Sequence, residues 1–338
     1  MKHFIGIDVA SETFTASLFQ APGKPVITRG PIDNAPDGFL SFVEWLKGQH
    51  AIPHNSVVCM EAIGVYGEAL TRSLAAKGFK IAIEPPLKVK RAFDQDGHKT
   101  DAVDSAQIAE YAYRFFDELR FWQPRTDILE KTKQSLCARE LLTKQSVAIQ
   151  NALIAHKRHV VQDKLLLDMY EKNLSLVKEQ IAQLDSHIQE LIHQDPSFHE
   201  LSLILISVCG VGILLAACLL VTTNGFKDIS DFKQMAAFVG ICPYQYQSGK
   251  SVHRNAHSRH FGPAYVRKLL HLAARSVATH NPEFRKYYYR KIEEGKCKSV
   301  ALNNIANKLL KISFAMIRDR KPYIKGYRSV NPLVLQRA

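Results

Sequence analysis

The stretch HFIGIDVASETFTASLFQ, residues 3–20, decides the fold of the first part of the chain. Its two halves, HFIGIDVA and TFTASLFQ, are rich in β-branched and aromatic residues, and a short polar break separates them. Such runs favour β-strands, and the short break between them is typical of a hairpin. The stretch therefore predicts two paired strands, the first of which ends near Asp8.

Strand and helix patterns alternate beyond this hairpin. A third strand is predicted in 21–30, a helix in 35–49, a strand in 55–62, a helix in 67–78 and a strand in 79–85. A further helix opens at Asp101. The order β-β-β-α-β-α-β-α predicts an α/β domain with a mixed sheet over residues 1–125.

The middle of the chain, residues 126–196, carries a heptad pattern that predicts a helical coiled coil, which we expect to mediate oligomerisation. The alternative is one long amphipathic helix packed on its own domain. Eight positions alternate in steps of three and four: Leu167, Tyr170, Leu174, Val177, Ile181, Leu184, Ile188 and Leu191. We expect a helical domain over 197–325 and a tail over 326–338.

Charge is distributed unevenly along the chain. Residues 250–338 contain 20 Lys and Arg against 4 Asp and Glu, a net charge of +16. Because the whole chain carries +13, the remaining residues carry −3. A basic module on a slightly acidic body predicts a polyanionic partner, nucleic acid above all. The alternative is a solvated basic surface.

The expected location is the bacterial cytoplasm, in association with the nucleoid, and cysteine usage and hydropathy favour a cytosolic protein. The six cysteines form no C-x-x-C pair, which predicts reduced, buried thiols. The first residues run directly into a strand, so they do not resemble a signal peptide. Residues 201–225 are uncharged and long enough to cross a bilayer. Gly210 and Gly212 interrupt them, however, and predict two shorter helices instead of a membrane span.

Four acids form the first candidate site. Asp8 and Glu61 end two predicted strands, and Asp101 and Asp104 lie one turn apart at the head of a predicted helix. Taken singly, each is an ordinary turn, cap or helix-dipole residue. Gathered at one sheet edge, the carboxylates would repel one another unless hard cations bound them. Two Mg²⁺ ions held there could clamp both oxygens of a phosphodiester displacement.

Three motifs carry a resemblance to a known family. GIDVA (6–10), EAIGVYG (61–67) and KTDAVDSAQIAEY (99–111) resemble the DEDD-type transposases, which include the Piv/MooV-type DNA invertases and their insertion-sequence relatives. The resemblance implies a first domain similar to a RuvC resolvase, with a ribonuclease-H-like fold. It also implies that Asp8, Glu61, Asp101 and Asp104 bind Mg²⁺, for which Mn²⁺ substitutes.

Two further stretches extend the resemblance to about residues 3–120 and 200–275. SVCGVGILLAACLL (207–220) resembles the family's helix-hairpin-helix-like element with its G-x-G turn. FKQMAAFVGICPYQYQSGKSV (232–252) resembles the block whose serine-glycine pair supplies the nucleophile, which implies Ser248 here. Attack on phosphorus would give a phosphoserine link that conserves bond energy for religation. Ser251, in the same predicted loop, is the alternative nucleophile.

Polar and small residues near these motifs are the candidate contacts to nucleic acid. They are Lys99, Gly210, Gly212, Lys250, Ser251, Arg254, Arg259, Arg267 and Lys268. Many relatives have a Ser-Lys-x-Gly run where this chain reads HSRHFGPAYVRKLL (257–270), so Arg259 replaces the charge of a lysine without its geometry. His253, His257 and His260 have helix-like spacing, but their basic neighbours favour phosphate contacts over zinc.

Three consecutive tyrosines, Tyr287 to Tyr289, lie among Arg285, Lys286, Arg290 and Lys291. Aromatic rings among cations are typical of a groove in which bases or sugars stack. Tyrosines with polar tips at the edge of a core have the same pattern. The sequence leaves both interpretations open.

These observations together predict a site-specific DNA recombinase, either a transposase or an invertase. The expected partners are DNA, a structured guide (bridge) RNA of the kind that insertion-sequence members of the family use, and further copies of the chain that form a dimer and then a tetramer on DNA. One alternative is a Mg²⁺-dependent nuclease or junction resolvase that uses the acids without a covalent step. The other is a non-catalytic nucleic-acid-binding protein.

Overall fold

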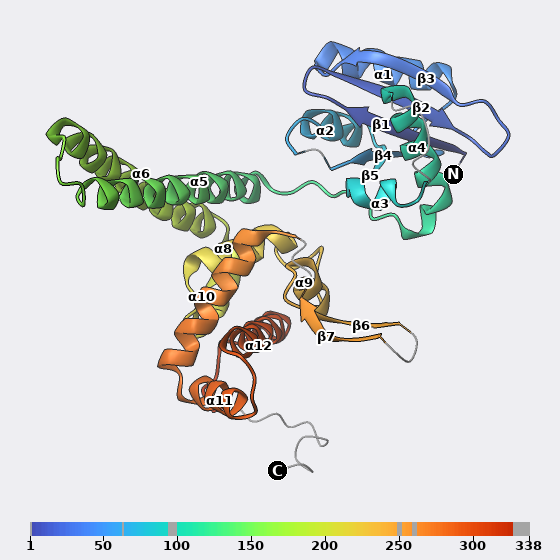
Figure 1. Ribbon diagram of the computed structural model, residues 1–338. Coiled ribbons are helices and arrows are strands. Elements are labelled where there is room, and N and C mark those ends of the chain that lie inside the picture. Colours follow the sequence, from blue (N-terminus) through green and yellow to red (C-terminus); the bar gives the residue numbers. More distant parts are fainter. Residues whose placement is uncertain (1, 63, 94–99, 249–251, 259–261, 327–338) are drawn as a thin grey trace, which may run out of the picture. The chain divides into compact units, whose positions relative to one another are not determined.

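The computed structural model describes residues 2–62, 64–93, 100–248, 252–258 and 262–326 (Figure 1). The chain divides into two compact units, Met1–Pro124 and Arg125–Ala338. Each unit has its own hydrophobic core, so each is described by itself.

The first unit is built on a five-stranded sheet in the order β3-β2-β1-β4-β5. The strands are β1 (His3–Val9), β2 (Thr13–Phe19), β3 (Ile27–Asp33), β4 (Ser56–Glu61) and β5 (Lys80–Glu84). β1 pairs antiparallel with β2 and parallel with β4, and β4 pairs parallel with β5. The predicted hairpin and the predicted mixed sheet are both confirmed.

Helices cover both faces of this sheet. α1 (Pro36–Gly48) and α2 (Glu68–Ala76) share a core with alternate strand residues such as Ile5, Ile7 and Met60. α3 (Pro86–Lys90) and α4 (Asp101–Arg114) share the second core with the intervening residues, among them Cys59. A short 3₁₀ helix, η1 (Phe116–Glu118), follows α4. Because side chains alternate along a strand, residue parity decides which helices each strand residue meets.

α4 lies unusually close to β1, and small residues permit this contact. A Cβ atom built on Gly6 would lie 2.2 Å from the backbone N of Ala109 and 2.2 Å from the carbonyl O of Ser105. Beside it, the hydroxyls of Ser17 and Ser105 are 2.8 Å apart, and both residues are fully buried. Glycine and serine therefore bring the helix backbone onto the sheet.

The contacts along α4 also give its direction. The ring centroid of Phe4, near the start of β1, lies 5.3 Å from that of Tyr113, near the end of α4. Gly6, further along β1, meets residues nearer the start of the helix. α4 therefore runs antiparallel to β1, and its first turn lies at the carboxyl end of that strand.

The second unit begins with two long helices, α5 (Asp127–His156) and α6 (Lys164–Gln194), which pack against each other. The Arg139 guanidinium on α5 binds the Asp185 carboxylate on α6 in a two-pronged ion pair, with one N–O distance of 3.0 Å. The heptad residues of α6 are buried or half-buried. Their apolar seam thus packs within the chain, as the amphipathic-helix alternative describes.

The remaining helices enclose the core of the second unit. They are α7 (Pro196–Ile206), α8 (Ile213–Thr223), α9 (Phe232–Phe238), α10 (Ala264–His280), α11 (Pro282–Glu293) and α12 (Lys298–Asp319). α8 supplies much of the buried apolar surface. The predicted break at Gly210–Gly212 is confirmed, because α7 ends before it and α8 begins after it. In the described parts of the chain, no helix is both long and apolar enough to span a bilayer.

The segment expected to be a loop between α9 and α10 contains a two-stranded hairpin of β6 (Pro243–Ser248) and β7 (Val252–Ser258). Its residues are almost all polar or aromatic, so no apolar alternation reveals it. His253 and His257 both lie on β7, about 13 Å apart along the strand. Because β7 is a strand, the helix-like spacing does not place these two residues one helical turn apart, and His260 lies outside the described residues.

All six cysteines are free, as expected. Cys59 and Cys218 are buried, but Cys137, Cys209 and Cys297 are exposed, so the expectation of burial is wrong for these three. Burial raises the pKa of the Cys218 thiol to about 12. It also raises the pKa of Cys59, with smaller contributions from nearby carboxylates.

We predict that Gly6→Ala destabilises the first unit by about 3 kcal/mol, because the added methyl group overlaps the backbone of α4. Both tryptophans of the chain, Trp45 and Trp122, lie in this unit, so tryptophan fluorescence during urea unfolding reports on it alone. Gly48→Ala is the matched control. A Cβ at Gly48 meets no atom within 4 Å, and the change should alter the stability by less than about 1 kcal/mol. Equal midpoints for both variants would contradict the close approach.

Candidate active site

Asp8 and Glu61 lie side by side at one edge of the sheet of the first unit. β1 and β4 are parallel, and Ile7 pairs with Met60, so the next residues, Asp8 and Glu61, are neighbours with Cα atoms about 4.8 Å apart. Asp8 is two residues beyond Gly6, which faces α4, so both face that helix. Glu61 has the same relation to Cys59 in the core beneath α4.

Asp101 and Asp104 occupy the first turn of α4, whose amino end lies at this same edge. The Thr100 hydroxyl caps the helix by accepting a hydrogen bond from the Val103 amide, at 3.3 Å. Asp101 is exposed and Asp104 is half-exposed. The structure therefore brings all four predicted acids to one edge and one face of the sheet.

The four carboxylates share an edge but do not converge on one point. Among the residues that the structure describes, no three His, Cys, Asp or Glu side chains are close enough together to hold a metal ion. Lys99, predicted to contact DNA beside the aspartates, lies outside the described residues. The donor set nevertheless has the chemistry that Mg²⁺ prefers, because every member is a carboxylate.

A fifth acid, which sequence reasoning missed, adjoins this group. Glu84 ends β5 and pairs in register with Glu61. Only 5% of it is exposed, and its carboxylate lies 3.2 Å from the Lys88 ammonium. Lys88 also lies 5.7 Å from the ring centroid of Tyr111, a buried residue whose phenol pKa is raised chiefly by burial. The only signal in the sequence is a glutamate at a strand end, directly before Pro85.

The second candidate site lies on the β6–β7 hairpin. Ser248 is the last residue of β6, and Arg254 lies within β7. Lys250, Ser251 and Arg259 lie outside the described residues. Ser248, the predicted nucleophile, therefore ends β6, a strand that begins two residues after the buried Ile241.

Hydrogen bonds to two backbone carbonyls anchor the base of this hairpin. The Ile241 carbonyl accepts from the amide nitrogens of Asn303 and Asn307 on α12, at 2.9 and 3.0 Å. The Val239 carbonyl accepts from Nη1 of Arg267 at 2.8 Å. Arg267, predicted to contact nucleic acid, thus also has a structural partner, whereas its neighbour Lys268 is exposed.

The two glycines of the G-x-G turn differ in their surroundings. Gly210 has a φ of 89°, a backbone conformation that favours glycine. A Cβ there would lie 2.9 Å from Val277 of α10, so close packing also favours a residue without a side chain. A Cβ at Gly212 would meet no atom within 4 Å. Gly212 is the N-cap of α8, so open space lies beside a helix amino end there.

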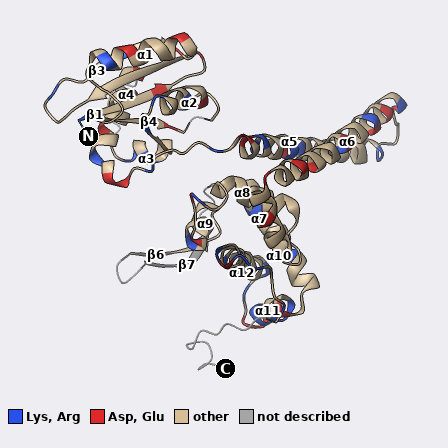
Figure 2. Cartoon of the chain, turned by 180° about the vertical axis from the view of Figure 1, so that it is seen from behind, with Lys and Arg blue, Asp and Glu red and all other residues tan. Residues whose placement is uncertain are grey.

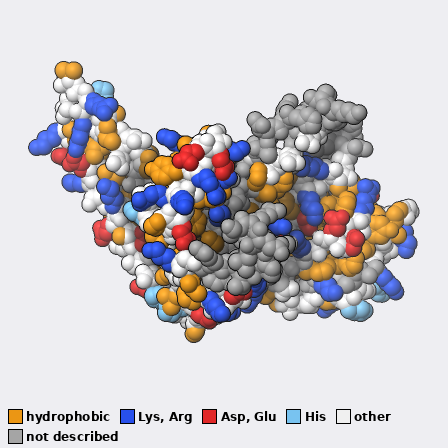
Figure 3. Space-filling view, turned by 90° about the horizontal axis from the view of Figure 1, so that it is seen from below, with side chains coloured by type: hydrophobic (Ala, Val, Ile, Leu, Met, Phe, Trp, Pro, Cys, Tyr) orange, Lys and Arg blue, Asp and Glu red, His pale blue; other side chains and the backbone are white. Residues whose placement is uncertain are grey.

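Basic residues outnumber acidic ones on α10 and α11. α10 carries three Lys and Arg and no acid, and α11 carries four against two glutamates (Figure 2). On the face of the molecule shown in Figure 3, basic side chains lie among hydrophobic ones, with fewer acidic side chains between them. This mixture suits a polyanion that also offers apolar surface, as unpaired bases do.

Two models of transposase families match this chain. The DEDD transposase model of the IS110 type matches residues 5–160, and the model of the IS116/IS110/IS902 transposase family matches residues 202–289. The first match contains the four acids, and the second contains Ser248 and the G-x-G turn.

Similar proteins carry related names. The pilin gene-inverting protein of Moraxella bovis is 28% identical over 335 residues, covering 96% of this chain and 98% of that protein. The transposase of insertion sequence IS1111A from Coxiella burnetii is 24% identical, covering 95% and 91%. A protein of insertion element IS110 from Streptomyces coelicolor is 32% identical over 147 residues, covering 44% and 35%. Both transposase models match in order along the chain, which is therefore similar to transposases of the IS110 type and to a pilin gene-inverting protein.

Proposed function

We propose that this chain is a site-specific DNA recombinase that uses the acid edge of its first unit together with Ser248. The observation that carries the proposal is the gathering of Asp8, Glu61, Asp101 and Asp104 on one face and edge of the sheet. The family matches support it, since one contains the acids and the other the serine. The relatives include a gene-inverting protein and a transposase, so inversion and transposition are both reactions to test.

In the proposed reaction, the Ser248 hydroxyl attacks a phosphodiester phosphorus. The Oγ–P bond forms while the P–O bond to the leaving sugar oxygen breaks, and a carboxylate of the acid edge accepts the hydroxyl proton. The leaving oxygen takes up a proton in turn. Because one phosphodiester replaces another, the reverse step with a different strand end rejoins DNA without an external energy source.

The acid edge would hold a divalent ion, Mg²⁺ or Mn²⁺. Bound there, the ion would supply positive charge to the phosphate oxygens as the bond breaks. Asp101 and Asp104 would reach it by rotating their side chains, since one is exposed and the other half-exposed. Glu84 would support the edge indirectly, because Lys88 neutralises it beside Glu61. The first unit would then serve as the RuvC-like part of the enzyme.

The reaction draws on both units, of one chain or of two chains in a dimer that becomes a tetramer on paired DNA sites. Exposed apolar residues along α5 and α6, among them Leu141, Leu165 and Met169, support assembly through this pair of helices. The coiled coil would then form between chains, in addition to the packing within each chain.

The basic C-terminal helices would also carry a structured guide RNA, which RNA sequencing of the purified protein would detect. The turn at Gly210–Gly212 would act as the helix-hairpin-helix-like contact to phosphate.

We predict that Ser248→Ala abolishes covalent capture of DNA, because the variant lacks the attacking oxygen. The substrate is a plasmid carrying the DNA that flanks the gene, and the readout is protein bound to DNA after denaturation, with the modified peptide identified by mass spectrometry. Ser251→Ala is the matched control and should leave the adduct intact. The reverse pattern would make Ser251 the nucleophile. Unchanged strand cleavage by Ser248→Ala would instead indicate a metal-dependent nuclease without a covalent step.

We predict that Asp104→Asn lowers the affinity of the protein for Mn²⁺ by about tenfold or more, since even outer partners of metal sites contribute about 10–100-fold. The signal of free Mn²⁺ in electron paramagnetic resonance measures this binding without DNA. Asp37→Asn is the control, because Asp37 is also a first-turn acid, at the head of α1. Equal affinities in both variants would rule out a metal role for Asp104.

Mixing the two inactive variants tests whether chains share a site. If recombination draws on acids from one chain and the serine from another, Asp104→Asn and Ser248→Ala proteins should together recover part of the activity that each lacks. A mixture as inactive as its components would place both groups in the same chain.

A further inference from the structure

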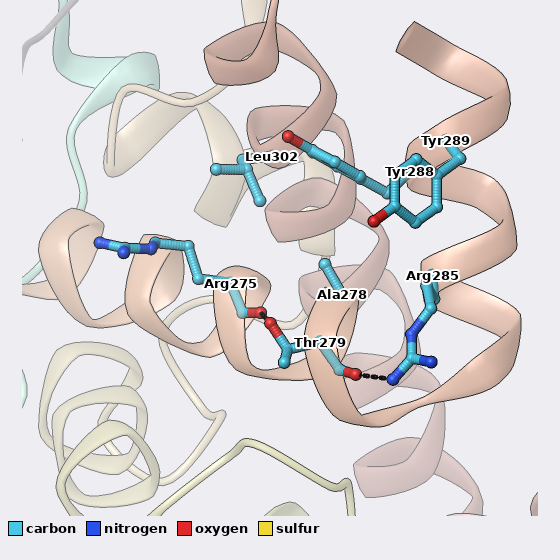
Figure 4. A pocket seen from close by; sticks show the side chains of 7 residues that line it. All are labelled: Arg275, Ala278, Thr279, Arg285, Tyr288, Tyr289 and Leu302. Carbon is cyan, nitrogen blue, oxygen red and sulfur yellow. Dashed lines mark hydrogen bonds between the residues drawn. The ribbon is translucent and has the colours of Figure 1, made fainter. Parts of the chain in front are cut away.

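A pocket of about 370 Å³ opens between α10, α11 and α12 in the second unit (Figure 4). Its size lies near the lower end of the range for small-molecule sites, about 300–1,000 Å³. Arg275 and Thr279 line it from α10, Arg285, Tyr288 and Tyr289 from α11, and Leu302 from α12. The pocket contains neither Ser248 nor any of the four acids.

The rings of Tyr288 and Tyr289 line the pocket and are oriented differently from each other. The ring centroids of Tyr288 and Tyr289 are 5.6 Å apart, with an interplanar angle of 74°. Tyr289 is 58% exposed, which is high for a large aromatic residue at the mouth of a pocket. Because the rings meet edge to face, the outer ring keeps a face on which a planar group can stack.

Two arginines provide the positive charge of the pocket, and no carboxylate of the described residues lines it. Arg285 donates one hydrogen bond to the Thr279 carbonyl at the end of α10, as Figure 4 shows. A guanidinium has five N–H donors, so Arg285 is held in place with donors remaining. Arg275 is exposed and extends away from the rings in Figure 4.

Tyr287, next to these two tyrosines in sequence, has cationic side chains of the protein packed against its ring. The Lys308 ammonium lies 3.8 Å from the ring centroid of Tyr287, and the Arg290 guanidinium lies 5.2 Å from it. Burial lowers the pKa of Lys308, and repulsion from neighbouring cations lowers it further. An anion bound nearby would relieve this repulsion.

We infer that the pocket binds an unpaired nucleotide of a single-stranded nucleic acid, with the base stacked on Tyr289 and a phosphate held by Arg285. Bases inside a duplex have no free face, so a stacking site of this kind selects unpaired strands. Arginine suits the phosphate because its planar fork matches two phosphate oxygens. DNA and RNA strands share this chemistry, and the experiment distinguishes them. Binding here requires neither the serine nor the metal chemistry proposed above.

The test measures fluorescence anisotropy of labelled 12-nucleotide strands, oligo(dT) and oligo(U), with the full-length protein. Tyr289→Leu should weaken binding of the preferred strand about tenfold, the loss expected for one stacked base. Tyr289→Phe is the matched control and should bind like the unchanged protein, because it retains the ring. An equal loss in both variants, or a loss in neither, would overturn the stacking.

Two further measurements address the phosphate and the duplex. Arg285→Gln should reduce the slope of log affinity against log salt by about 0.7, the value for one phosphate contact to a single strand. Binding of a 12-base-pair duplex should not change with Tyr289→Leu. A duplex that loses affinity as much as the single strands would show that the pocket does not select unpaired bases.

Photocrosslinking keeps the inference testable if a variant fails to fold. Strands that carry 5-iodouracil, irradiated on the unchanged protein, should attach to the peptide of α11 that contains Tyr288 and Tyr289. Stronger attachment of the RNA strand than of the DNA strand would identify RNA as the ligand, and the reverse would identify DNA. Adducts confined to other peptides would overturn the assignment.

Discussion

The approach of α4 to β1 at Gly6 is the constraint on which the first unit depends. With no Cβ at this position, the helix backbone rests on the strand, and the buried pair of Ser17 and Ser105 extends the same contact. A helix fixed at this distance and in this direction has its amino end at the carboxyl ends of β1 and β4. Asp101 and Asp104 therefore lie at the same edge of the sheet as Asp8 and Glu61, because Gly6 has no side chain to hold α4 away from β1.

Much of this arrangement could be predicted from the sequence because it follows from local patterns. Alternation along residues 3–20 predicts the hairpin, and the order of strands and helices predicts the mixed sheet. The pair Gly210 and Gly212 correctly predicts a break between two helices. Family motifs predict the acids as site residues, and strand parity then explains why Asp8 and Glu61 have the same orientation.

Other features depend on contacts between distant residues, which local patterns do not record. The heptads of α6 predict an apolar seam but do not identify its partner, which is α5 of the same chain. The β6–β7 hairpin lacks an apolar face and therefore looks like a loop in sequence. Glu84 was missed because its importance comes from its register with Glu61 and its pairing with Lys88. The distances between the carboxylates likewise depend on side-chain rotation.

The anchoring of the β6–β7 hairpin has a consequence for the order in which the protein is made. The Ile241 carbonyl, just before β6, binds two asparagines of α12 that lie 62 and 66 residues later in the chain. During synthesis, the strand that carries Ser248 leaves the ribosome well before these partners exist. A nascent chain thus contains Ser248 before it contains the asparagines that hold the start of the hairpin in place. The β6–β7 hairpin, which carries Ser248, can form these two hydrogen bonds only after α12 has been synthesised.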